Sequence, residues 1–96
     1  MKSLWTPEAE DNLQVIVRRM NAFSMGAGDR FADRLRNRLR NLELAPFLGR
    51  EVPEFGTPFL RELILRPYRV IYEVFPDRVE VVAIRHGRQR LPSDTD

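Results

Sequence analysis

The spacing of the apolar residues changes once along this chain, close to Pro46 and Gly49. Before that point apolar residues recur every three or four positions, which is the period of an amphipathic helix. After it they alternate with polar residues or form short runs rich in branched and aromatic side chains, which is typical of strands. The pattern therefore predicts an α+β domain in which helices pack on one face of an antiparallel sheet.

Two helices are expected in the first half of the chain. Thr6 followed by Pro7 indicates the start of the first helix, because a hydroxyl N-cap and a proline at the first helical position are both favourable there. Residues 21–28 contain two glycines and no period, so they predict a turn, and the second helix should occupy residues 29–45. Each helix has one apolar stripe: Ala9, Leu13, Ile16, Val17 and Met20 in the first, and Phe31, Leu35, Leu39 and Leu42 in the second.

The strands should form a meander of three or four members near the C-terminus. Short turns at Arg66-Pro67 and Pro76-Asp77 separate its last three strands. Pro53 makes the strand before them short and irregular, because proline cannot donate to a strand ladder. The expected strands, with a short one at the N-terminus, cover residues 2–5, 49–56, 59–65, 68–75 and 79–85.

Composition limits the functions that such a domain can have. Residues 1–91 are expected to form a single domain, and residues 92–96 a flexible tail. The chain has no cysteine and one histidine, which argues against disulfides, against a cysteine- or histidine-based metal site and for a protein without cofactors. Neither a secretion signal nor a membrane-spanning apolar run is apparent, so we expect a cytoplasmic protein. Lys2 is the only lysine among 16 basic residues, and arginine suits the recognition of phosphate or carboxylate groups.

The hairpin around Pro76-Asp77 predicts which side chains face the helices. A two-residue loop there fixes the register and gives one apolar face. The other face would bring Arg69 and His86 close together, beside an uncovered apolar patch that a partner would cover. The pairs expected on the helical face are Val74–Val79, Tyr72–Val81 and Val70–Ala83, and the expected patch comprises Ile71, Phe75, Val82 and Ile84.

The position of Arg61 depends on the preceding turn. A three-residue loop at 66–68 places Arg61 beside Arg69 and opposite Glu73, whereas a two-residue loop places it on the other face of the sheet. We favour the three-residue loop, because it avoids burying an arginine.

Several segments together resemble the RelE/ParE superfamily of toxins from bacterial type II toxin–antitoxin modules. Their order and spacing carry the resemblance, which covers nearly the whole chain, and the H-G-R sequence at 86–88 resembles the ParE-like branch. The resemblance implies a short N-terminal strand, a two-helix hairpin and a C-terminal meander. The segments are WTPEAEDNL (5–13), GREVPEFG (49–56), RELI (61–64), YRVIYEV (68–74) and RHGRQRL (85–91).

The resemblance also implies a function in growth inhibition and plasmid stabilization. ParE-like toxins poison DNA gyrase, and a cognate antitoxin neutralises the toxin by binding it directly in a hetero-oligomer. The apolar patch defined above would then bind the antitoxin. The surface that contacts gyrase would comprise Arg69, Arg85, His86, Arg88 and Arg90.

The alternative is a RelE-like endoribonuclease that cleaves messenger RNA on the ribosome. Arg69 falls where the resemblance implies a phosphate-binding arginine, and Arg61 and His86 would complete the catalytic group. However, Leu63 stands where the nucleases have a second lysine, and no tyrosine follows Gly87. A third possibility is a module that has lost toxicity and serves only in binding, or one that represses its own operon together with the antitoxin.

Overall fold

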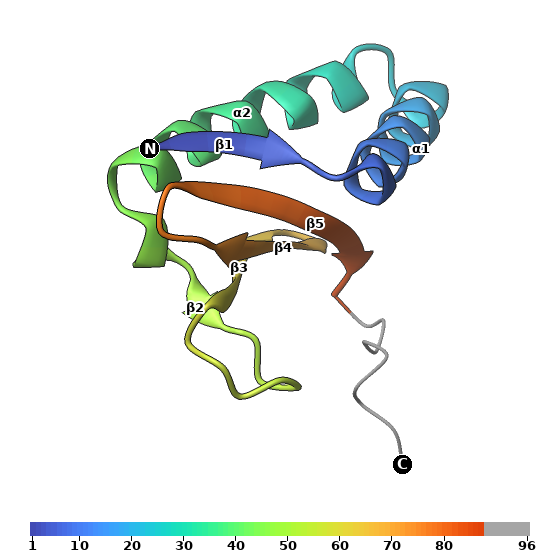
Figure 1. Cartoon of the computed structure of the whole chain (residues 1–96). Coiled ribbons are helices and arrows are strands. Elements are labelled where there is room, and N and C mark those ends of the chain that lie inside the picture. The colour runs from blue at the N-terminus through green and yellow to red at the C-terminus, as the bar shows by residue number, and fades with distance from the viewer. Residues whose placement is uncertain (88–96) are drawn as a thin grey trace.

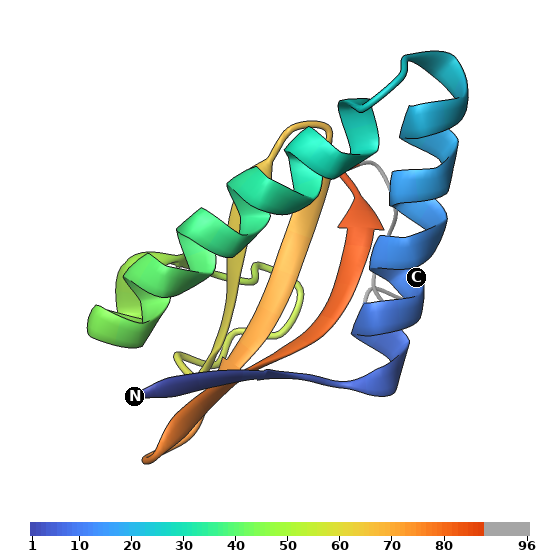
Figure 2. The ribbon, with the colours of Figure 1, turned by 90° about the horizontal axis from the view of Figure 1, so that it is seen from above.

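The computed structural model describes residues 1–87, and both helices lie on one face of a single sheet (Figure 1 and Figure 2). The strand order is β1-β5-β4-β3-β2, with β1 parallel to β5 and the other pairs antiparallel. The expected α+β architecture is therefore confirmed. Its elements are β1 (Lys2–Trp5), α1 (Pro7–Phe23), α2 (Ala27–Leu44), the 3₁₀ turn η1 (Pro46–Leu48), β2 (Arg50–Glu51), β3 (Leu60–Leu65), β4 (Tyr68–Val74) and β5 (Arg78–His86).

Local sequence signals account for the helical hairpin. The Thr6 hydroxyl accepts a hydrogen bond from the Ala9 amide at 3.2 Å and caps α1 as expected. The turn after α1 is shorter than expected, so α2 begins two residues earlier than residue 29. Gly28 lets the two helices approach closely, because a Cβ atom there would lie 2.3 Å from the carbonyl oxygen of Val17.

The main core lies between the helices and the sheet, and Tyr72 closes one end of it. The buried Tyr72 hydroxyl donates to the Pro46 carbonyl at 2.8 Å and accepts from the Gly49 amide at 2.9 Å. These two bonds fix the chain between α2 and β2 and satisfy the hydroxyl, which would otherwise be costly to bury. The largest completely buried side chains facing this core are Tyr72, Phe31, Leu35, Leu42, Val70, Val79 and Val81.

The β4–β5 hairpin follows the expected register only near its turn. Val74 pairs with Val79 and Tyr72 with Val81, but Val82 is then an extra residue in β5, and Val70 pairs with Ile84. The expected Val70–Ala83 pair is therefore wrong. A bulge of one residue turns every later side chain of its strand to the other face, so Ile84 lies in the main core.

The β3–β4 turn has two residues, so Arg61 pairs with Tyr72 and its expected place beside Arg69 is wrong. Arg61 nevertheless escapes burial. Its guanidinium donates to the carbonyls of Pro58 at 2.7 Å and Gly49 at 3.0 Å, and it stacks 5.0 Å from the centre of the Phe47 ring.

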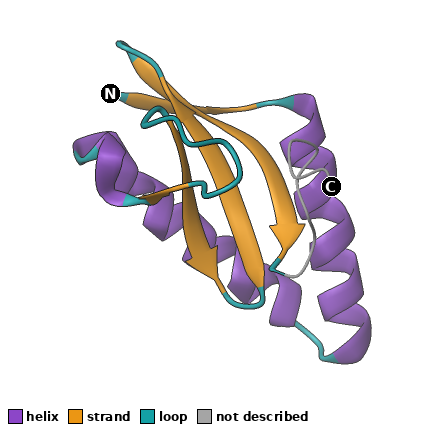
Figure 3. Cartoon of the chain, turned by 90° about the horizontal axis from the view of Figure 1, so that it is seen from below, coloured by secondary structure: helices purple, strands orange, loops and turns teal. Residues whose placement is uncertain are grey.

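The outer face of the sheet is not open, because the segment between β2 and β3 crosses it (Figure 3). Val52 from this segment is completely buried against Ile71, with Val82 partly buried beside them. Phe75 lies under the guanidinium of Arg78, 4.1 Å from the ring centre. With Ile84 in the main core, the expected exposed patch of four apolar residues is wrong.

Candidate functional site

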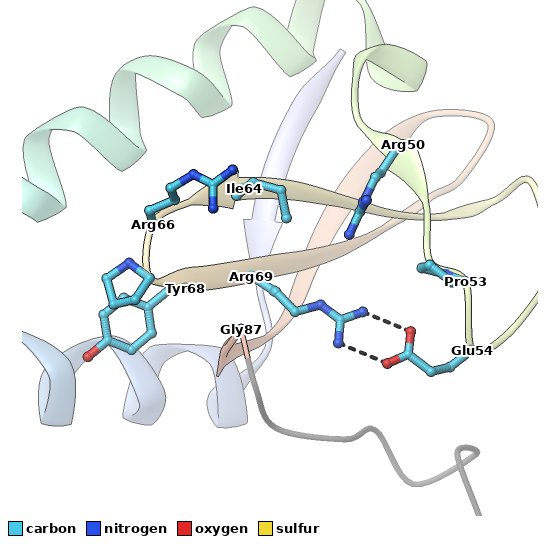
Figure 4. Close-up of a pocket in the computed structure, with 9 residues that line it drawn as sticks. Arg50, Pro53, Glu54, Ile64, Arg66, Tyr68, Arg69 and Gly87 are labelled. Carbon is cyan, nitrogen blue, oxygen red and sulfur yellow. Dashed lines mark hydrogen bonds and ion pairs between the residues drawn. The ribbon is translucent and has the colours of Figure 1, made fainter.

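A groove of about 590 Å³ lies on the outer side of the sheet, where the β3–β4 turn meets the segment after β2 (Figure 4). It contains Arg69, which the sequence predicted as a gyrase-contacting residue and, in the nuclease alternative, as a catalytic residue. The groove is lined by Arg50, Pro53, Glu54, Ile64, Arg66, Pro67, Tyr68, Arg69 and Gly87.

Two carboxylates hold Arg69 in this groove. Its two terminal nitrogens donate to the two oxygens of Glu54, both at 2.8 Å, in the bidentate geometry that Figure 4 shows. Its Nε donates to Glu62 at 2.7 Å. The side chain of Arg69 is 9% exposed and that of Glu62 is 0% exposed, so this pairing is largely shielded from water.

The network continues to a second arginine. The other oxygen of Glu62 accepts from Nε of Arg50 at 2.5 Å, which links β2, β3 and β4 through one chain of charges. The hydrogen bond from Arg69 lowers the pKa of Glu54 below its usual value. Hydrogen bonds to Glu54 and Glu62 raise the pKa of Arg69. Glu54 and Arg69 therefore stay charged at neutral pH.

His86 lies away from this groove, on the helical side of the sheet. Because of the bulge it is opposite Tyr68, and the two rings meet edge to face with centres 5.8 Å apart. Tyr68 in turn packs against Phe31 beneath the helices. The expected proximity of Arg69 and His86 is therefore wrong, because the extra residue in β5 sends their side chains to opposite faces.

Arg85 connects the end of β5 to α1. One terminal nitrogen donates to the Asn12 side chain at 2.9 Å, and the other bonds to Glu8. Arg88 and Arg90, the remaining members of the predicted target-binding set, lie outside the described residues. Three of the predicted target-binding residues lie within the described range. Arg69 lies in the groove, whereas Arg85 and His86 lie at the end of β5.

Sequence reasoning missed the carboxylates that surround Arg69. Glu62 could have been found, since a two-residue turn at Arg66-Pro67 puts it on the same face as Arg69 and next to it across the strands. Glu54 could not, because it lies in an irregular segment without strand parity.

Two kinds of site are not found in residues 1–87. Within that range no three His, Cys, Asp or Glu side chains are grouped so that they could hold a metal ion. None of the helices in the same range is long and apolar enough to cross a membrane.

Two solved structures share the α+β architecture of this domain. A chain from the "Chromosomal ParDE TA system from P. aeruginosa" matches with a TM-score of 0.73 and 18% identity, covering 90% of this chain and 95% of that one. The "YoeB/ParE toxin from Agrobacterium tumefaciens" matches with a TM-score of 0.65 and 22% identity, covering 90% of this chain and 98% of that one. At these identities the likeness shows the fold alone.

The sequence itself identifies the family. The model of the ParE toxin of type II toxin–antitoxin system, parDE, matches residues 4–91. This chain belongs to that family, within the RelE/ParE superfamily that its motifs resemble. No curated protein sequence matches the chain significantly.

Proposed function

We propose that this protein inhibits growth by binding and poisoning DNA gyrase in the cytoplasm, without catalysing a reaction of its own. Membership of the ParE toxin family supports a toxin. The bidentate pairing of Arg69 with Glu54 is the observation that carries the choice of gyrase over messenger RNA, because it occupies the arginine that a nuclease would need.

The nuclease alternative requires several groups to converge on one phosphate. Cleavage by a 2′-hydroxyl needs a base, an acid and a cation within hydrogen-bond reach of the reacting atoms. Arg69 is engaged by Glu54 and Glu62, Arg61 lies on the opposite face of the sheet, and His86 lies on the helical side. The separation of Arg61, Arg69 and His86 supports a binding toxin.

We propose that gyrase is contacted at the end of β5, by His86 with Arg85 beside it, and by Arg88 and Arg90 beyond it. Arginine is one of the residue types that most often dominate the binding energy of an interface. His86 is the residue chosen for the test, because it is exposed at the end of β5.

The proposal is tested with a gyrase supercoiling assay on toxin freed of antitoxin. The wild-type protein should block supercoiling, and His86→Ala should require roughly tenfold more toxin for the same inhibition. Arg36→Ala, which changes an exposed arginine of α2, is the matched control and should behave as wild type. Unchanged supercoiling at saturating wild-type toxin would exclude gyrase as the target. Cleavage of ribosome-bound message by the wild-type protein would instead favour the nuclease.

We further propose that a cognate antitoxin neutralises the toxin, and that it binds at the turn between α1 and α2. Of the four apolar residues selected from the sequence, two are buried and two are partly buried within the chain. In contrast, Phe23 and Met25 at this turn are 94% and 92% exposed. Beside them lies a groove of about 560 Å³ with a mainly apolar lining that includes Phe31 and two arginines, Arg30 and Arg34. An antitoxin segment with apolar and acidic side chains would match this surface.

The antitoxin gene is expected next to the toxin gene, as a short reading frame with an acidic C-terminal half. Its purified product should bind the Phe23→Ser, Met25→Ser double variant at least about tenfold more weakly than wild type. Leu44→Ser removes an equally exposed apolar side chain at the other end of α2 and should leave the affinity unchanged. Equal affinity for both variants would place the antitoxin elsewhere.

A further inference from the structure

The charges of α2 are divided unevenly between the two flanks of the helix. Asp29 and Asp33 line the groove between α1 and α2, and Glu43 accepts a hydrogen bond of 2.8 Å from a serine hydroxyl of β1. Arg34 and Arg38 lie on the opposite flank, four residues apart, so that they are neighbours one helical turn from each other. This flank therefore carries positive charge without a carboxylate from its own helix.

A third arginine joins this flank from the sheet. Arg66 belongs to the β3–β4 turn, which lies beside α2 (Figure 2), and it lines a groove of about 350 Å³ together with Arg34 and Arg38. Arg34 stacks on the buried Phe31, 5.8 Å from the ring centre. None of the three guanidinium groups forms an ion pair with a carboxylate of residues 1–87. This set of three residues, the arginine edge, thus presents three charges that the described part of the chain does not neutralise.

The side chains around the arginine edge suit the backbone of a double-stranded nucleic acid. Asn37 lines the same groove, and the exposed Asn41 follows one turn later on α2. Arginine and asparagine side chains are typical donors to backbone phosphates. Proteins that bind single strands also need aromatic side chains on which bases stack, and none of the described residues lining this groove is aromatic. A duplex needs no such platform, because its phosphates are regularly spaced on the outside.

We propose that the arginine edge binds the phosphate backbone of duplex DNA, independently of base sequence. Each guanidinium neutralises one phosphate and releases its counterions, and the neighbouring asparagine amides add hydrogen bonds. The choice of DNA over duplex RNA rests on the proposed function, in which the toxin acts on an enzyme of DNA, but the binding itself requires no gyrase. The arginine edge is separate from the end of β5, and it adjoins the groove proposed for the antitoxin, which Arg34 also lines.

The test is a titration of a short fluorescent DNA duplex with toxin freed of antitoxin, followed by anisotropy between about 50 and about 200 mM salt. Each neutralised phosphate contributes about −0.9 to the slope of log K against log salt concentration, so the wild type should give about −2.7. The double variant Arg38→Gln, Arg66→Gln should give about −0.9 and bind more weakly. The matched control Arg18→Gln, Arg36→Gln removes the same charge from the groove between the helices and should keep the wild-type slope.

Two further variants separate charge from folding. Arg38→Lys, Arg66→Lys keeps both charges and should keep the slope, and Arg66→Gln alone changes an exposed turn residue and should make the slope less negative by about 0.9. The proposal is overturned if the double glutamine variant keeps the wild-type slope, if the control loses as much, or if duplex RNA or polyglutamate binds as tightly as DNA. A toxin that binds DNA but leaves supercoiling unchanged refutes the gyrase proposal alone, and a gyrase inhibitor that does not bind DNA by itself refutes this proposal alone.

Discussion

Replacing Arg69 with methionine should destabilise the protein more than any other change of a charged side chain in the groove. Methionine fills a similar volume, but it removes the bonds that Arg69 makes to Glu54 and to Glu62, whose side chain is completely out of water. Removing one member of a buried ion pair typically costs about 3–5 kcal/mol, and the bond that Glu62 keeps to the largely exposed Arg50 places this variant near the lower limit. For a domain of this size, each kcal/mol lowers the melting temperature by about 4–8 °C, so the lower limit of this cost predicts a decrease of at least about 12 °C.

The assay is urea unfolding of purified protein followed by the fluorescence of Trp5, the only tryptophan, which packs against the main core. Arg36→Met is the control, because Arg36 pairs with Asp33 in water, with exposures of 62% and 75%, and its loss should cost about 0–1 kcal/mol. The double variant Arg69→Met, Glu62→Leu should recover part of the loss, since it removes the completely buried carboxylate of Glu62 together with its partner. If Arg69→Met unfolds no more easily than Arg36→Met, the network does not support the fold as described.

Three further predictions concern other contacts of the described structure. Tyr72→Phe should cost about 1–3 kcal/mol in urea unfolding, because the Gly49 amide loses its buried acceptor. Gly28→Ala should cost about 1–3 kcal/mol or more and lower the melting temperature, since the added methyl group meets the Val17 backbone. The pKa of Glu54 is lower in the folded protein, so its stabilisation is complete above the usual value of 4.5 and is lost as the pH falls through the folded value. The free energy of unfolding measured between pH 7 and pH 3 should therefore fall less steeply in Glu54→Gln than in wild type.

Most of the fold was predictable because most elements have their own local signal. The strand expected over 49–56 is an exception, since only Arg50–Glu51 forms a strand there. The Thr6-Pro7 start and the Pro76-Asp77 turn depend on residues close together in sequence, and the structure confirms both. The candidate site was less predictable, because it depends on how distant strands meet. The extra residue at Val82 has no glycine or proline to mark it, yet it decides on which face His86 lies.

The sequence also did not predict that the segment between β2 and β3 covers the outer face of the sheet. Alternation along β4 indicates that Ile71 points away from the helices, and this is correct. It does not indicate whether another segment covers that side chain. Val52 does so from an irregular stretch interrupted by Pro53, where no periodicity indicates the direction of a side chain.

The parallel pairing of β1 with β5 has a consequence for biosynthesis. β1 leaves the ribosome well before its hydrogen-bonding neighbour in β5, at Arg78–Val81, has been made. Such a contact between strands far apart in sequence forms late, since the intervening residues must be available before it can close. A nascent or truncated product that stops before β5 lacks the strand that joins β1 to β4, so this sheet can be completed only after β5 has been synthesised.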